Sequence, residues 1–295
     1  MPITSTGLVF TLLSALAWAA FDAFRKRLAR EVSPVFLGLL LSLVQAPLLA
    51  LWAATREPFG LPTASLGPLA ASALLNGVAV VLFLDALRLA PMSLLIPLLS
   101  FTPVISTSLA WLFRGQAPGF VQYAGAALVV SGAWVLRLGS GPWGGLGATL
   151  REPGVRRMLL VACLWSCTSV LDQTAVNRGA GAWYAPVVTA AVAVLMLLWT
   201  ALRSQVRTFL LAAKPLASRP LLAGLAVVIG AGALAVQIEA FRWAPVGFIE
   251  VVKRGTGMAS AVLLGRLVFG EPLNGRKVMA VVLLTLGVAL VVGLR

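Results

Sequence analysis

Histidine is absent from the 295 residues, and acidic side chains are scarce. Without histidine the chain lacks the commonest metal ligand and the usual proton relay near neutral pH. Charged residues make up 11% of the chain, whereas a soluble domain carries roughly 25%. This number of charged residues is too small to form the water-facing surface of a soluble protein. We therefore expect a protein outside the soluble class, with no metal and no other cofactor.

Other chemistry-bearing features are also missing. Cys163 and Cys167 are the two cysteines, four residues apart on one predicted helix, and we expect them to be reduced packing residues. The chain contains no Gly-x-Ser-x-Gly motif and no nucleotide-binding motif. We therefore expect neither an enzyme nor direct drive by ATP. The net charge of +14 does not predict nucleic-acid binding, because no basic stretch alternates with aromatic residues.

What the chain does contain is long apolar runs. Apolar residues make up 60% of it, and the mean hydropathy is +0.99. A helix that spans a bilayer needs roughly 20 mainly apolar residues, and only helices and closed barrels can satisfy their backbone there. The runs lack the alternation of barrel strands. They predict an all-α integral membrane protein with ten transmembrane helices, near residues 6–25, 34–54, 64–87, 92–113, 118–137, 157–177, 182–202, 221–241, 246–268 and 276–294.

The second half of the chain repeats the first. An offset of 147 places Trp18 on Trp165 and Trp52 on Trp199, and an offset near 155 places Gly132 on Gly287. An offset of 154 superposes the segment 85–91 (DALRLAP) on 239–245 (EAFRWAP). These matches predict two five-helix repeats, at 1–138 and 156–295, joined by a loop at 139–155. Because five is odd, the copies enter the membrane in opposite senses, which is the inverted-repeat plan of secondary transporters.

Basic residues in the loops predict the orientation. The odd-numbered loops carry sixteen Lys or Arg residues, and the even-numbered loops with the C-terminus carry five. Loops rich in Lys and Arg face the cytoplasm, so both termini are expected outside. We expect a multi-pass protein of a bacterial inner membrane, in contact with the lipid bilayer. A homodimer and a monomer are both open.

Charged residues within the ninth span are the first site candidates. Glu250, Lys253 and Arg254 occupy one broad face of that helix, and a charge at the bilayer centre needs a partner, a cavity or a ligand. Arg offers a planar fork for carboxylate or phosphate, and Lys a compact positive charge. Two interpretations stay open: the cluster binds an anionic substrate, or Glu250 neutralises Arg254 and the cluster fixes helix packing.

Other polar residues in the spans are secondary candidates. Asp22 and Asp172, the latter beside Gln173, could exchange a proton during transport, as could Glu250. Alternatively, Asp22 pairs with Arg25 or Lys26, and Asp172 with Lys253 or Arg254. Further substrate-binding candidates are Trp18 and Trp165 as cavity walls and the polar Gln45, Asn76, Ser100, Thr102 and Gln237.

Some residues are expected to be structural. The carboxylates Asp85 and Glu239 each precede an arginine by three residues, Arg88 and Arg242, which predicts an intrahelical pair in each repeat. Tyr123, Trp183 and Tyr184 lie near span ends and are expected in the interfacial aromatic belt.

The chain resembles the drug/metabolite transporter superfamily, and within it the EamA-type transporters. The resemblance rests on ALRLAPMS at 86–93, Pro103, FRGQ at 113–116, AFRWAP at 240–245, FGEP at 269–272 and LGV at 286–288. It implies ten helices in two inverted repeats. Lys253 and Arg254 are similar to the phosphate site of the triose-phosphate translocators of that superfamily, which implies an anionic, even phosphorylated, substrate. Many members are drawn with both termini in the cytoplasm, contrary to the loop charges here.

We therefore expect a secondary transporter of a small organic anion that works by alternating access. A transporter or flippase of an amphipathic or lipid-linked metabolite is one alternative, since a helix bundle can also open sideways. A non-transporting membrane scaffold or receptor is another, and a solid centre with no cavity would favour it.

Overall fold

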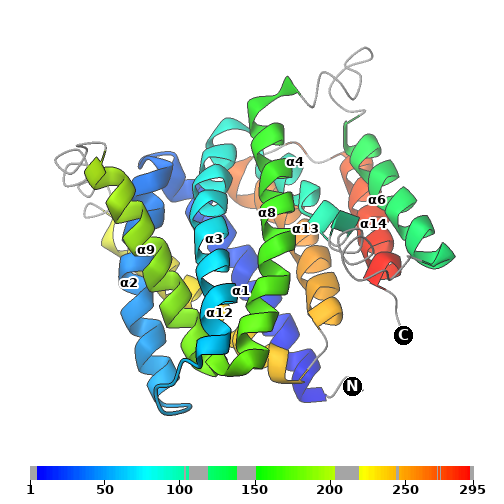
Figure 1. Ribbon diagram of the computed structural model, residues 1–295. Coiled ribbons are helices and arrows are strands. Elements are labelled where there is room, and N and C mark those ends of the chain that lie inside the picture. The colour runs from blue at the N-terminus through cyan, green and yellow to red at the C-terminus, as the bar shows by residue number, and fades with distance from the viewer. Residues whose placement is uncertain are drawn as a thin grey trace.

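The computed structural model describes residues 5–102, 104–105, 119–137, 151–202, 219–243, 246–270, 272 and 274–292. Within these residues the regular elements are helices, and no strand occurs. Figure 1 shows the long helices standing side by side as one bundle. The all-helical class expected from the hydropathy pattern is thus confirmed for the part of the chain that the structure describes.

Each predicted span contains a helix. The first half holds α1 (Ser5–Ala29), α2 (Pro34–Ala54), α3 (Thr63–Leu89), α4 (Met92–Leu98) and α6 (Phe120–Arg137). The second half holds α8 (Pro153–Ala175), α9 (Tyr184–Leu202), α12 (Pro220–Trp243), α13 (Val246–Phe269) and α14 (Gly275–Val292). The fourth predicted span is described only in part, and the predicted loop at 139–155 is described only from residue 151 onward.

Proline and glycine fix several helix boundaries. Pro34 starts α2 at a position where its missing N–H costs nothing, and Pro91 precedes α4 in extended conformation. After α8 the chain passes through η2 (Val176–Ala180) and η3 (Gly181–Trp183). The backbone φ angle is 98° at Gly179 and 52° at Gly181. Residues other than glycine rarely adopt such positive φ angles. These two glycines let the chain reverse between α8 and α9.

Five described segments are long and apolar enough to cross a membrane: α1, α2, α3, α12 and the stretch Pro153–Leu202. At about 1.5 Å per residue a straight 50-residue helix would far exceed the bilayer thickness. The reversal at Gly179 and Gly181 divides this stretch into α8 and α9. Helix α13 carries Lys253, Arg254 and Arg266, which lower its hydropathy. The count of ten crossings and their inverted order stay predictions.

Helices of the two halves pack against each other in a regular pattern. The main contacts join α2 to α9, α6 to α14, α1 to α12 and α3 to α8. In the predicted repeat, α1 corresponds to α8 and α3 to α12, so the last two pairs are equivalent. Figure 1 shows α6 and α14 side by side at one edge of the bundle.

Two glycines allow α6 and α14 to approach closely. A Cβ atom on Gly287 would lie 2.7 Å from Val129 N and 2.8 Å from Gly125 O. One on Gly132 would lie 3.0 Å from Leu284 N and 3.1 Å from Ala280 O. Small residues at such crossings let membrane helices pack backbone to backbone. Gly132 and Gly287 are the pair that the sequence offset superposes.

Candidate functional site

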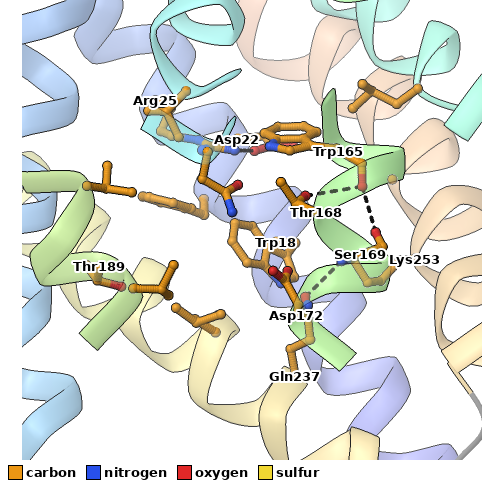
Figure 2. A pocket seen from close by; sticks show the side chains of 18 of the residues that line it. Trp18, Asp22, Arg25, Trp165, Thr168, Ser169, Asp172, Thr189, Gln237 and Lys253 are labelled. Carbon is orange, nitrogen blue, oxygen red and sulfur yellow. Dashed lines mark hydrogen bonds and ion pairs between the residues drawn. The ribbon is translucent and has the colours of Figure 1, made fainter. Parts of the chain in front are cut away.

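A cavity of about 220 Å³ lies in the middle of the bundle, between residues of the two halves. Helices α1, α2, α3 and α4 line it from the first half, and α8, α9, α12 and α13 from the second. Its polar lining residues are Asp22, Arg25, Ser42, Gln45, Asn76, Thr168, Ser169, Asp172, Tyr184, Thr189, Gln237, Lys253 and Arg254. Figure 2 shows several of these side chains around Trp18, among them Asp22, Asp172 and Lys253, which come from different helices.

Arg25 is held inside the cavity wall by a carboxylate and aromatic rings. Its Nη2 donates to Asp22 Oδ1, one turn earlier on α1. Its guanidinium carbon lies 4.4 Å from the ring centroids of both Phe21 and Phe83, and 5.8 Å from that of Trp18. Ion pairing and cation–π contact both stabilise a buried guanidinium. The pairing alternative for Asp22 is therefore the arrangement that the structure has.

Lys253 lies on the opposite side of Trp18 in Figure 2 from the Asp22–Arg25 pair. Its Nζ donates to Gln237 Oε1 at 2.8 Å and lies 5.4 Å from the centroid of the Trp18 ring. The indole Nε1 of Trp18 is itself buried and has no hydrogen-bond partner among the described residues. An ammonium of the cavity lining and an unsatisfied indole N–H within its wall thus lie near each other.

Asp172 is the centre of a hydrogen-bond network on the second-half side. Its Oδ1 accepts hydrogen bonds from the hydroxyls of Ser72 on α3 and Tyr184 on α9. Ser72 Oγ and Tyr184 Oη are 3.1 Å apart, and Asn76 Nδ2 donates to Ser72 Oγ at 3.0 Å. Three helices are thereby joined at one carboxylate, which fixes its place in the wall.

Most of the residues predicted for the site meet at this cavity. The lining includes Trp18, Asp22, Gln45, Asn76, Trp165, Asp172, Gln237, Lys253 and Arg254. Ser100 and Thr102 are not brought to it: Ser100 Oγ donates to Pro97 O at 2.6 Å in the turn after α4, and Thr102 is buried with its carbonyl accepting from Ser166. The side chains of Glu250 and Gln173 lie outside the described residues.

Neither Ser72 nor Tyr184 of this network was predicted as a site residue. Ser72 gives no signal in an Ala- and Leu-rich span. Tyr184 was expected in the interfacial belt, but it is only 2% exposed and its hydroxyl reaches Asp172. Its place at the very start of α9, after the reversal at Gly181, turns it inward. A tyrosine at a helix end looks the same in sequence whether it faces lipid or the core.

The expected intrahelical pairs are also wrong. Asp85 pairs with Arg157, and Glu239 with Arg56, rather than each with the arginine three residues later on its own helix. Arg242 pairs instead with Glu57. All three contacts join the two halves of the chain. Helical spacing permits an i, i+3 pair but does not exclude a better-placed partner on a neighbouring helix.

A helical bundle with a polar cavity between its two halves is the arrangement that secondary transporters use for their substrate site. Residues 5–138 match the model of the EamA-like transporter family. The predicted resemblance is confirmed for this segment, and the EamA-like transporter family that it matches is part of the drug/metabolite transporter superfamily. Together with the apolar helices of the described residues, the match shows an integral, multi-pass membrane protein. The family that matches its first half consists of membrane transporters of small solutes.

Comparison with solved structures extends the likeness to the whole fold. One crystal structure, described only as that of a protein, superposes with a TM-score of 0.62 at 17% identity. The match covers 97% of this chain and 96% of the other. At this identity the likeness concerns the fold alone. No curated protein matches the chain.

Proposed function

We propose that the chain is a secondary transporter that carries a small organic anion through the central cavity by alternating access. The single observation that carries this proposal is the pairing of Lys253 and Trp18 at a cavity between the two halves. A substrate bound there would contact both halves at once, as rocking around a central site requires. The regular packing of equivalent helices supports the inverted repeat on which such rocking depends.

The charges of the lining favour an anion over a cation. The described lining contains three cations, Arg25, Lys253 and Arg254, and two anions, Asp22 and Asp172. The rings of Trp18 and Phe21, which could receive a cationic solute, are already contacted by Arg25 and Lys253. A cationic solute would therefore have to displace the protein's own cations. An anion would instead gain the ammonium of Lys253 and the indole N–H of Trp18.

The cavity also favours transport over a scaffold role, because a scaffold needs no space at the centre. For coupling we propose Asp172, since it lines the cavity. Asp22 is engaged by Arg25 and serves mainly to hold that side chain.

The predicted orientation places the turn between α2 and α3 outside the cell and the α1–α2 connection in the cytoplasm.

A thermal-stabilisation screen of the purified protein tests the substrate class. Organic phosphates, carboxylates, amino acids and cationic drugs are compared for the rise in unfolding temperature that each causes. We expect an anion to stabilise the wild type and to lose about ten- to a hundredfold in affinity with Lys253→Ala, as for one charged hydrogen bond. A hit is then followed as labelled solute taken up by proteoliposomes.

Arg266→Ala is the matched control, because Arg266 is an exposed cation on the same helix that does not line the cavity. Equal stabilisation of wild type, Lys253→Ala and Arg266→Ala would place the binding site elsewhere. Stabilisation by cationic drugs alone would contradict the anionic class. Stabilisation by amphipathic compounds alone would favour the flippase alternative, and binding without uptake would favour a receptor.

A further inference from the structure

Two carboxylates at equivalent positions of the repeat tie the halves of the molecule together. Asp85 and Glu239 are separated by the offset of 154 that superposes their two segments. Asp85 Oδ2 lies 3.1 Å from Arg157 Nε, and Glu239 Oε1 lies 3.2 Å from Arg56 Nε. In each pair the carboxylate belongs to one half and the arginine to the other. We call these the Asp85 latch and the Glu239 latch.

The two latches lie at opposite ends of the bundle. Asp85 is in the last turns of α3, whereas Arg56 is in the turn that precedes the start of that helix at Thr63. Helix α3 has 27 residues, which corresponds to about 40 Å. Figure 1 shows the two ends of α3 at the two ends of the bundle, with the cavity helices between them. One latch therefore lies on each side of the cavity.

The Glu239 latch is part of a crossed arrangement of charges. Arg56 faces Glu239, while the adjacent Glu57 accepts from Arg242 at 3.1 Å. Glu57 also accepts the backbone N–H of Ala182, and its carbonyl accepts from Trp183 Nε1 at 3.1 Å. Both contacts join the α2–α3 turn to η3 of the second half.

Apolar side chains fill the space between this latch and the cavity. Tyr184, Val188, Leu234 and Phe241 belong both to the cavity lining and to a packed cluster with residues of α2 and α3. A solute leaving the cavity at this end must separate that cluster. Separation moves α12 away from the α2–α3 turn, so Arg56 and Glu239 have to part.

The Asp85 latch has a similar position at the other end. Leu84, next to Asp85, lines the cavity and packs in a second apolar cluster with Phe83, Leu87 and Met158. A second tie between the halves, Arg219 to Glu31 at 2.6 Å, lies at the same end, where α1 finishes and α12 begins. Opening here requires that Asp85 releases Arg157.

We propose that Asp85 and Glu239 are the two latches of the transport cycle, each of which must release its arginine before the cavity opens at its own end. The inference rests on the proposed alternating access. Both arginines are at least one-third exposed, 36% for Arg157 and 45% for Arg56. Asp85 is also partly exposed, at 31%, and an exposed ion pair contributes little stability, so this latch can break and re-form within a cycle. The Glu239 side chain is 9% exposed, so its release of Arg56 has to accompany the opening of the bundle that lets water reach the carboxylate.

Thiol accessibility tests the latches without any substrate. Thr189→Cys, in a chain whose Cys163 and Cys167 are replaced by serine, places one thiol in the cavity lining. A membrane-impermeant thiol reagent is added to either face of sealed vesicles. Glu239→Gln should raise the labelling rate about two- to fivefold from the face where α1 begins, and Asp85→Asn from the opposite face, as for loss of one partly exposed pair.

A second cysteine variant and two charge-swapped variants make the result of the labelling experiment decisive. Gly60→Cys, in open space within the α2–α3 turn, identifies the face on which the Glu239 latch lies. The swapped pairs Arg56→Glu with Glu239→Arg, and Arg157→Asp with Asp85→Arg, should return labelling to the wild-type rate. Unchanged labelling, or a rise from the same face or from both faces in the two variants, would overturn the proposal. Since no solute is used, failure here is distinct from failure of the anion screen.

Discussion

Gly230 on α12 is the position where a single methyl group should damage both stability and the cavity. A Cβ atom there would lie 2.1 Å from Gln45 Nε2 and 2.6 Å from Phe21 Cζ. Ordinary van der Waals contact begins at 3.4 Å, so the Gln45 amide would have to move by about 1.3 Å. Gln45 donates to Val227 O at 3.4 Å and lines the cavity. Gly230→Ala therefore pushes this side chain off its acceptor.

Overpacking of this kind costs about 1–3 kcal/mol. The end of Gln45 can rotate away, but the buried ring of Phe21 must shift as well, so we expect Gly230→Ala to fall within that range. The assay is thermal unfolding in detergent, with and without the anion found in the screen. We expect a lower unfolding temperature and weaker anion binding. Gly232→Ala is the matched control, because the same methyl group two residues away on α12 meets nothing within 4 Å. Equal behaviour of the two variants would refute the packing described around Gly230.

Two more predictions concern other parts of the molecule. Gly287→Ala should lower the unfolding temperature more than Gly230→Ala, since the new methyl group would meet backbone atoms of Val129 and Gly125, which cannot rotate away. The control Gly224→Ala, in open space, should leave the unfolding temperature unchanged. Similar losses in Gly287→Ala and Gly224→Ala would contradict the packing of α6 against α14. Asp172→Asn should make anion uptake into proteoliposomes insensitive to an imposed pH gradient while anion binding persists; a gradient response equal to that of the wild type would remove Asp172 from the coupling role.

The helices could be predicted from the sequence because a bilayer leaves few choices. The apolar runs and the proline before α4 place the start of each described helix within a few residues. The offset also superposes Gly132 on Gly287, and the structure adds that both face the backbone of the opposite half. The positions of the helices can be predicted in this way because hydrophobic periodicity and residue spacing depend on the sequence of each helix alone.

Contacts across helices could not be predicted in the same way. Lys253 has Gln237 as a hydrogen-bond acceptor, and Asp85 has Arg157 instead of the nearby Arg88. The partner of each charged side chain depends on which helices are neighbours and on how each helix is rotated about its axis. Tyr184 shows the same limit: its inward direction follows from the reversal at Gly181, which one sequence does not display as a reversal.

Helices α6 and α14 pack closely against each other, apart from the helices that line the cavity. Within the described residues, neither helix contributes to the cavity lining, and each has the other as its main neighbour. Substitutions that alter solute preference should therefore accumulate on the other helices, while this pair tolerates change only where its glycines are kept. For protein engineering, the lipid-facing side of α14 is the place to attach a reporter that leaves recognition untouched.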